Sequence, residues 1–167
     1  MDLRIVQFDL AHVPEVAAIE AASYRDPWSK ASFQEVIILA DTSWVALADG
    51  MVAGFLITQW VLDEIHILNI AVKAEFRQQG IAAQLLTTLV DLSVQRGMKE
   101  MFLEVRLTNT AAQKLYRKFG FTHLATRKNY YSDGEDALIM FRQLPASGDF
   151  PGQAVSIIDD PGDQHGN

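Results

Sequence analysis

Residues 75–90 read "EFRQQGIAAQLLTTLV" and join a polar turn that contains glycine to a run with helical spacing. Such a turn at the start of a helix presents unpaired backbone N–H groups and the positive end of the helix dipole, which suit a phosphate or pyrophosphate. The residues available for that purpose are Arg77, Gln78, Gln79 and Gly80. An ordinary strand-to-helix connection with solvated polar residues explains the same letters equally well, so the turn alone leaves both interpretations open.

Hydrophobic periodicity on both sides of this turn predicts strands and helices in a mixed order. Apolar runs bounded by turn residues indicate strands, and apolar residues at helical spacing indicate helices. The expected strands are residues 3–8, 43–48, 52–60, 64–72, 100–106, 121–131 and 135–144. The expected helices are residues 14–22, one that begins after Ser29 or Ser32, 81–96 and 109–119. The order β-α-α-β-β-β-α-β-α-β-β indicates a mixed α/β (α+β) fold.

Local turn residues support these boundaries. Asp49-Gly50 between two apolar runs predicts a hairpin, and Gly97 and Gly120 are suited to end helices. Ser32, with Glu35 three positions later, has the spacing of a capping box. Residues 1–144 therefore predict one domain, whereas residues 145–167 are rich in Pro, Gly and Asp and predict an irregular tail.

Composition excludes several classes of protein. The formal net charge of −7 argues against nucleic-acid binding and favours a cationic partner. The chain has no cysteine, and its four histidines lack the spacing of metal ligands, so we expect no metal site. Neither a signal peptide nor an apolar run of membrane-spanning length is visible. We expect a soluble cytoplasmic protein and favour a monomer.

The turn resembles a known cofactor signature. Residues 77–82, "RQQGIA", match the acyl-CoA motif [QR]-x-x-G-x-[GA] of the GNAT superfamily of N-acetyltransferases, with Ala82 where many members have a second glycine. The segments "LDEIHILNIAV", "FLEVRLTNTAAQKLYRKFGF", "RKNYYSDGEDALIM" and "PWS" extend the similarity to the RimI branch, which acetylates the N-terminal alanine of a small-subunit ribosomal protein. The resemblance covers residues 4–144 and implies a central, mostly antiparallel mixed sheet flanked by helices.

The resemblance implies where acetyl-CoA binds. Backbone groups at the end of the "NIAV" strand are expected to pair with the pantetheine arm, and backbone amides of the turn with the pyrophosphate. Asn109 is expected to contact the cofactor, although it can also serve simply as the N-cap of the following helix. The implied cofactor-binding residues are Ile70, Ala71, Val72, Arg77, Gln78, Gln79, Gly80, Ile81, Ala82, Ala83 and Asn109.

The resemblance also assigns two catalytic residues. Glu104 matches the glutamate that acts as general base, through water, on the incoming amine. Tyr116 matches the tyrosine that protonates the departing CoA thiolate. From the letters alone, a solvent-facing strand residue is the better interpretation of Glu104, and Tyr116 can be an aromatic core residue. His66 lies in a predicted strand, and we interpret it as a half-exposed structural residue.

Two loops are expected to hold the protein substrate. By resemblance, Trp28 in the first loop and Tyr130 and Tyr131 in the last wall the groove for a protein N-terminus, although each is also a plausible packing residue. Acidic residues near these loops can attract a basic ribosomal protein or merely be solvated; they are Asp63, Glu64, Asp133, Glu135 and Asp136. The alternatives are an acetyltransferase for a lysine side chain or a small amine, and a non-catalytic acetyl-CoA-binding module.

Overall fold

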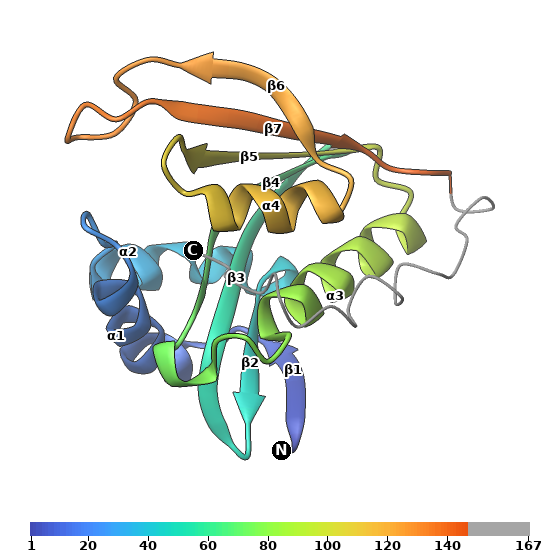
Figure 1. Cartoon of the computed structure of the whole chain (residues 1–167). Coiled ribbons are helices and arrows are strands. Elements are labelled where there is room, and N and C mark those ends of the chain that lie inside the picture. The colour runs from blue at the N-terminus through green and yellow to red at the C-terminus, as the bar shows by residue number, and fades with distance from the viewer. Residues whose placement is uncertain (147–167) are drawn as a thin grey trace.

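The computed structural model describes residues 1–146, which form one sheet with helices on both of its faces (Figure 1). Its strands are β1 (Leu3–Gln7), β2 (Trp44–Ala48), β3 (Met51–Val61), β4 (Glu64–Val72), β5 (Glu100–Arg106), β6 (Thr122–Arg127) and β7 (Ala137–Gln143). Its α-helices are α1 (Val13–Ser23), α2 (Lys30–Glu35), α3 (Ile81–Gln95) and α4 (Thr110–Lys118). Three 3-10 helices connect them: η1 (Leu10–His12), η2 (Val36–Thr42) and η3 (Ala74–Phe76).

The strand order within the described residues is β1-β2-β3-β4-β5-β7-β6. Every neighbouring pair is antiparallel except β4 and β5, which run parallel. This parallel pairing covers only residues 64–67 of β4 and 100–103 of β5, although both strands continue further. The predicted fold class and element order are confirmed, and the sheet opens in its middle, between β4 and β5.

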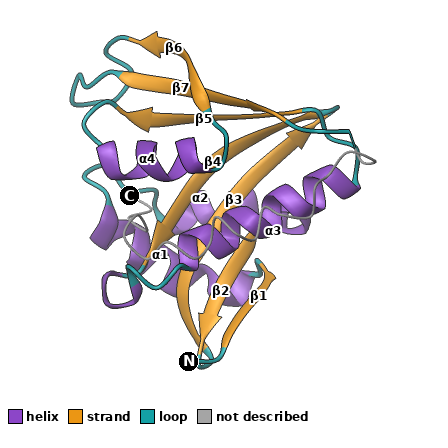
Figure 2. Ribbon diagram, turned by 45° about the vertical axis from the view of Figure 1, so that its right-hand side comes forward, coloured by secondary structure: helices purple, strands orange, loops and turns teal. Residues whose placement is uncertain are grey.

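Helices cover both faces of the sheet (Figure 2), and each face has its own hydrophobic core. The larger core packs α3 and α4 through residues such as Leu85, Leu89 and Leu115, all of which are almost completely buried. The smaller core packs α1 and α2 against β3, with Phe33 and Phe55 in an edge-to-face contact at 5.5 Å between ring centroids. α1 lies over β3 and β4 with α2 beside it, and the same face of β5 and β7 stays partly exposed.

Glycine is required at two places in the sheet. The β2–β3 hairpin turns through Asp49 and Gly50, which have φ of 48° and 83°, the left-handed conformations that such a two-residue turn needs. In β3, a Cβ added to Gly54 would lie 2.9 Å from the backbone oxygen of Ala71 in β4. Only glycine allows these two strands to approach so closely here.

One expected boundary is wrong, and one of two alternatives is decided. β6 ends at Arg127, so residues 128–131 are not strand; the chain instead turns, with Asn129 at a φ of 55°. The helix cap belongs to Ser29, whose hydroxyl accepts the backbone N–H of Ser32 at 3.1 Å. Ser32 is itself inside α2, so the capping-box spacing with Glu35 was coincidental.

The remaining expectations concern the tail, membranes and metals. Most of the expected tail, residues 147–167, lies outside the described residues. Within residues 1–146, no helix is both long and apolar enough to cross a bilayer. The same part of the chain contains no group of three or more acidic or histidine side chains placed to hold a metal ion.

Candidate active site

An inner pocket of about 140 Å³ lies where β4 and β5 part. Beyond their last paired residues, Ile67 and Leu103, the two strands diverge, and side chains from α1, α4 and both flanking loops close the space. The pocket is lined by Glu20, Tyr24, Asp26, Trp28, Ile67, Leu68, Asn69, Ile70, Leu103, Glu104, Tyr116 and Tyr131. The opening of the sheet therefore brings the two predicted catalytic residues to one cavity.

Glu104 faces this pocket from β5, and its side chain is only 18% exposed. Its Oε2 lies 2.5 Å from Nε2 of His66, which is on the neighbouring strand β4. When the carboxylate is ionised it can only accept, and the imidazole Nε2–H is then the donor. His66 is half-exposed, as expected, but it also orients the predicted base. The sequence showed no sign of this pairing, because 38 positions separate the two residues.

Tyr116 lines the same pocket from α4, which packs in the larger core on the other face of the sheet. It is 5% exposed and packs edge-to-face on Phe121, with 5.9 Å between ring centroids. Burial raises the pKa of its phenol well above the ordinary value, and the nearby Tyr131 raises it further. Tyr116 is therefore a packed core aromatic, and it also lines the pocket wall as a protonated phenol, which leaves its role as a general acid a prediction.

The turn before α3 has the geometry of an anion-binding loop. Gly80 is the N-cap of α3 with a φ of 81°, and no side chain in the described residues caps this helix end. The side chains of Ile81, Ala82 and Ala83 are buried in the core, so it is the backbone N–H groups of the first turn that point out of the helix end. These residues fit a pyrophosphate held by main-chain amides.

The polar side chains of the same turn have structural partners. Arg77 donates from Nε to the backbone oxygen of Val72 at 3.1 Å and from Nη2 to Ser23 Oγ at 3.3 Å. Gln79 donates to the backbone oxygen of Glu75 at 3.3 Å, and Gln78 has a positive φ of 62°. Arg77 and Gln79 therefore shape the turn through their side chains, and Gln78 shapes it through its backbone.

The two other predicted cofactor elements flank the opening in the sheet. Ile70, Ala71 and Val72 form the end of β4 beyond its pairing with β5, and their side chains are buried. Asn109 is the N-cap of α4, where its Oδ1 accepts the backbone N–H of Ala112 at 3.1 Å. The capping role of Asn109 is thus confirmed.

A second cavity, which we call the loop cleft, adjoins the inner pocket and has a volume of about 570 Å³. It is lined by Asp26, Pro27, Trp28, Ser29, Ser32, His66, Leu68, Glu104, Arg106, Tyr130 and Tyr131. The cleft brings together all three predicted substrate-binding residues, Trp28, Tyr130 and Tyr131, together with Glu104. Tyr130 and Tyr131 contact each other edge-to-face, with 5.0 Å between ring centroids.

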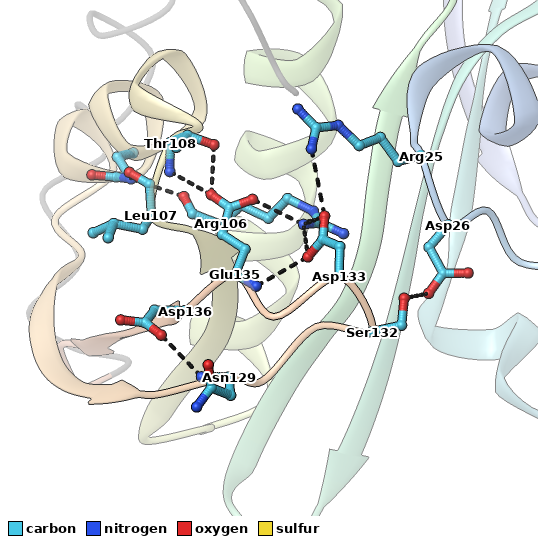
Figure 3. A network of polar contacts seen from close by, with 11 residues as sticks. Arg25, Asp26, Arg106, Leu107, Thr108, Asn129, Ser132, Asp133, Glu135 and Asp136 are labelled. Carbon is cyan, nitrogen blue, oxygen red and sulfur yellow. Dashed lines mark hydrogen bonds and ion pairs between the residues drawn. The ribbon is translucent and has the colours of Figure 1, made fainter.

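Arg106 holds the loop of residues 128–136 in place through Asp133 and Glu135 (Figure 3). Its Nη1 lies 2.9 Å from carboxylate oxygens of both Asp133 and Glu135, and its guanidinium stacks 4.0 Å above the centre of the Tyr131 ring. Hydrogen bonds from Thr108 and from Arg106 lower the pKa of Glu135. Asp133 and Glu135 are therefore both paired with Arg106, and Asp133 is paired with Arg25 as well, so neither carboxylate is free to attract a basic peptide.

Contacts between the two loops close one side of the cleft (Figure 3). Ser132 Oγ donates to Asp26 Oδ2 at 2.6 Å, and Arg25 forms a 3.5 Å ion pair with Asp133. Both contacts join the loop after α1 to the loop before β7, which are more than 100 positions apart in the chain. The loop cleft therefore lies between two loops that are joined to each other by a hydrogen bond and an ion pair.

Glu20 is a pocket residue that the sequence analysis missed. It is 1% exposed, and its carboxylate accepts hydrogen bonds from the Asn69 side-chain amide and the Trp28 backbone. Burial is the main cause that raises its pKa to about 7, against the opposing effect of those hydrogen bonds. A signal was present in the letters, because Glu20 falls on the same helical stripe as Val13 and Val16.

Comparison with known proteins agrees with this geometry. Residues 13–121 match the Acetyltransferase (GNAT) family. The chain belongs to the GNAT acetyltransferase family. An Escherichia coli (strain K12) member named [Ribosomal protein bS18]-alanine N-acetyltransferase is 38% identical over 146 residues, which cover 86% of this chain and 97% of that protein.

Solved structures of GNAT proteins superimpose on this chain. The ribosomal-protein-S18-alanine N-acetyltransferase from Escherichia coli gives a TM-score of 0.81 at 34% identity, covering 89% of this chain and 98% of that one. Ard1 from Thermoplasma volcanium gives 0.83 at 28% identity, covering 87% and 99%. The predicted GNAT fold is confirmed, and this GNAT chain is an acetyl-CoA-dependent N-acetyltransferase.

Proposed function

We propose that this GNAT enzyme acetylates the α-amino group of an N-terminal alanine on a small-subunit ribosomal protein, as the name of its Escherichia coli relative states for that protein. The observation that carries the proposal is the joint placement of Glu104 and Tyr116 in one pocket, which continues into the loop cleft. Acetyl-CoA supplies an acetyl group activated as a thioester. The reaction then needs a base for the amine and an acid for the thiolate.

Glu104 is proposed to be the general base. An α-amino group has a pKa of about 7.7 to 8.0 and is mostly protonated at neutral pH, so it must lose a proton before its nitrogen attacks the thioester carbon. Glu104, acting through a water molecule, accepts that proton. His66 is a positioning residue, since its 2.5 Å hydrogen bond restrains the Glu104 carboxylate at the pocket wall.

Tyr116 is proposed to be the general acid. As the C–S bond breaks, negative charge develops on the sulfur, and a phenol can donate first a hydrogen bond and then its proton to it. The raised pKa of Tyr116 ensures that the phenol is protonated at neutral pH. The proposed base and acid reach the pocket from opposite sides, because Glu104 lies on β5 and Tyr116 on α4.

We propose that the cofactor lies along the opening of the sheet. Main-chain amides of residues 79–83, including Gly80, bind the pyrophosphate, with Arg77, Gln78 and Gln79 shaping the turn around it. The backbone of Ile70, Ala71 and Val72 runs beside the pantetheine arm, and Asn109 borders it from α4. The protein N-terminus enters through the loop cleft between Trp28 and the pair Tyr130 and Tyr131.

Intact-mass analysis tests this function directly. The protein is incubated with acetyl-CoA and a short peptide that begins Ala-Arg, and we expect a gain of one acetyl group on the free α-amine. A matched peptide with a blocked α-amine and an internal lysine should gain none. Acetylation of the blocked peptide would instead support a lysine acetyltransferase, and absence of any product despite CoA binding would support a binding module.

Two variants test the assigned roles. Glu104→Gln and Tyr116→Phe should each lower kcat on the order of 100-fold, because each removes one proton-transfer group. Their affinity for acetyl-CoA, measured by calorimetry, should stay within about twofold of the parent value, because neither residue is among those proposed to bind the cofactor. Full turnover in both variants would show that the acid–base assignment is wrong.

A further inference from the structure

A β-bulge in β4 turns the side chain of Asn69 toward α1. Side chains of a strand alternate between its two faces, yet Ile67 and Ile70, three positions apart, are both buried in the larger core. The pairing of β4 with β3 shifts its register between them, which leaves Leu68 as an extra residue. Asn69 therefore lies on the face of the smaller core, as Ala71 does, instead of following Ile67 into the larger one.

The carboxyl group of Glu20 fixes the orientation of the Asn69 amide. Asn69 Nδ2 donates to Glu20 Oε2, and the same carboxyl group accepts the backbone N–H of Trp28. Because an ionised carboxylate can only accept hydrogen bonds, the nitrogen end of the amide has to face Glu20. The other end of the amide, the carbonyl oxygen Oδ1, therefore points away from Glu20.

Oδ1 of Asn69 opens on the inner pocket. Within residues 1–146, the contact with Glu20 is the one side-chain hydrogen bond of Asn69, and the one buried side-chain oxygen or nitrogen without a partner is Oγ1 of Thr87. Oδ1 is therefore not sealed inside the protein. Asn69 is half-buried and lines the inner pocket, so its carbonyl oxygen is available to a ligand there.

The inner pocket offers two different acceptors to a small group. Pockets for drug-sized ligands measure about 300 to 1,000 Å³, whereas this one measures about 140 Å³, so it suits a small group such as an amine. Glu104 can accept a hydrogen bond and then take the proton. Asn69 Oδ1 can accept a hydrogen bond but does not titrate. An amine, which carries more than one N–H, can use both acceptors at once.

We propose that Asn69 binds the amine to be acetylated through its Oδ1, and that Glu20 is the positioning residue that turns Oδ1 toward that amine. One N–H donates to Oδ1 and stays intact throughout the reaction. The proton that leaves the nitrogen goes through water to Glu104, and the nitrogen lone pair forms the new N–C bond as the C–S bond of the thioester breaks. This inference deepens the proposed function and rests on it for the identity of the substrate.

A pair of peptides tests Asn69 by calorimetry. One begins Ala-Arg with a free α-amine, and in the other a propionyl group replaces the alanine, so that only the amine is missing. With CoA in place of acetyl-CoA nothing is transferred, and the Kd of the second peptide divided by that of the first, the amine ratio, measures what the amine contributes. At pH 8, above the pKa of about 7 for Glu20, we expect Asn69→Ala to lower the amine ratio about tenfold, because a hydrogen bond from a charged donor is lost.

The control for this substitution is Gln95→Ala, at an exposed position at the end of α3, which should leave the amine ratio unchanged. Affinity for acetyl-CoA within about twofold of the parent value shows that a variant is folded. Because the amine ratio compares two peptides on the same variant, a general loss of stability cancels from it.

Glu20→Gln tests the positioning role without touching Asn69. Its single oxygen has to serve both donors, and its nitrogen can instead donate to Asn69 Oδ1, which lets the amide turn its nitrogen toward the pocket. The amine ratio should fall about fivefold and peptide KM should rise, while acetyl-CoA KM stays unchanged. Glu35→Gln, exposed on α2, is the matched control and should change none of these values.

The outcomes separate this inference from the proposed function. An amine ratio that stays at the parent value in both Asn69→Ala and Glu20→Gln would overturn the inference, and acetylation of the Ala-Arg peptide by the parent would still uphold the function. If the parent acetylates only an internal lysine, the function fails. The amine ratio taken with a lysine peptide and its norleucine counterpart then decides the inference.

Discussion

Glu20→Gln should change how the stability of this protein depends on pH. Glu20 is a buried carboxylic acid at the inner pocket, and its pKa is raised to about 7, mainly by burial. Glutamine has nearly the same shape but cannot ionise. It also keeps one acceptor oxygen for the hydrogen bonds that Asn69 and the Trp28 backbone donate to Glu20.

The sign and size of this pH effect on stability follow from proton linkage. Between the unfolded pKa of 4.5 and the folded pKa of about 7, the folded protein holds a proton on Glu20 that the unfolded chain has lost. The free energy of unfolding therefore falls as pH rises through this interval and is level above it. A shift of about 2.5 pKa units corresponds to roughly 3 kcal/mol, which is an upper value because unfolded chains are not fully solvated.

Urea denaturation at pH 5 and pH 8 measures the effect. At pH 5 the variant should be the less stable protein by about 1 kcal/mol, since one hydrogen bond is lost. At pH 8 the difference in the free energy of unfolding between the two proteins should shift in favour of the variant by up to about 3 kcal/mol. The reason is that only the parent then buries a charge. Glu35→Gln, at an exposed position on α2, is the control. An equal stability difference at both pH values would refute the buried-acid argument.

Three further substitutions test the frame around the site. Gly54→Ala should lower the free energy of unfolding by about 1 to 3 kcal/mol in urea titrations, because its Cβ meets the Ala71 backbone oxygen at 2.9 Å. Gly80→Ala should lower the free energy of unfolding by about 1 to 2 kcal/mol, because alanine is strained at a φ of 81°. It should also weaken acetyl-CoA binding, measured by calorimetry. Arg106→Ala removes the cation stacked on Tyr131, so steady-state kinetics should show peptide KM rising about tenfold while acetyl-CoA KM is unchanged.

Much of the fold could be predicted from local signals. Periodicity and turn residues such as Asp49-Gly50 located the elements, because hairpin turns and amphipathic helices depend on neighbouring residues. The prediction that this strand extends to Tyr131 was wrong. It was made because the apolar and aromatic residues of this stretch are typical of strands. Tyr131 instead belongs to a loop held by Arg106, a contact that local propensity does not encode.

The candidate site divides in the same way. The turn at Gly80 was visible in the letters, since a left-handed N-cap and a following helix are properties of adjacent residues. Glu104 and Tyr116 required a family resemblance, because nothing near either residue distinguishes a catalytic group from a strand or core residue. The partner of Glu104, His66, could not be inferred, since the contact depends on the parallel pairing of β4 with β5.

By itself, the sequence determined the order of strands and helices, the phosphate-suited turn and the membership of the GNAT family, because these depend on short runs of neighbouring residues. Tertiary structure alone decided that β4 and β5 part beyond Ile67, that Glu20 is buried with a raised pKa, and that Asn69 lines the inner pocket beside Glu20. These features depend on distances and solvent exclusion between segments far apart in the chain, which are set only when the sheet closes around its two cores.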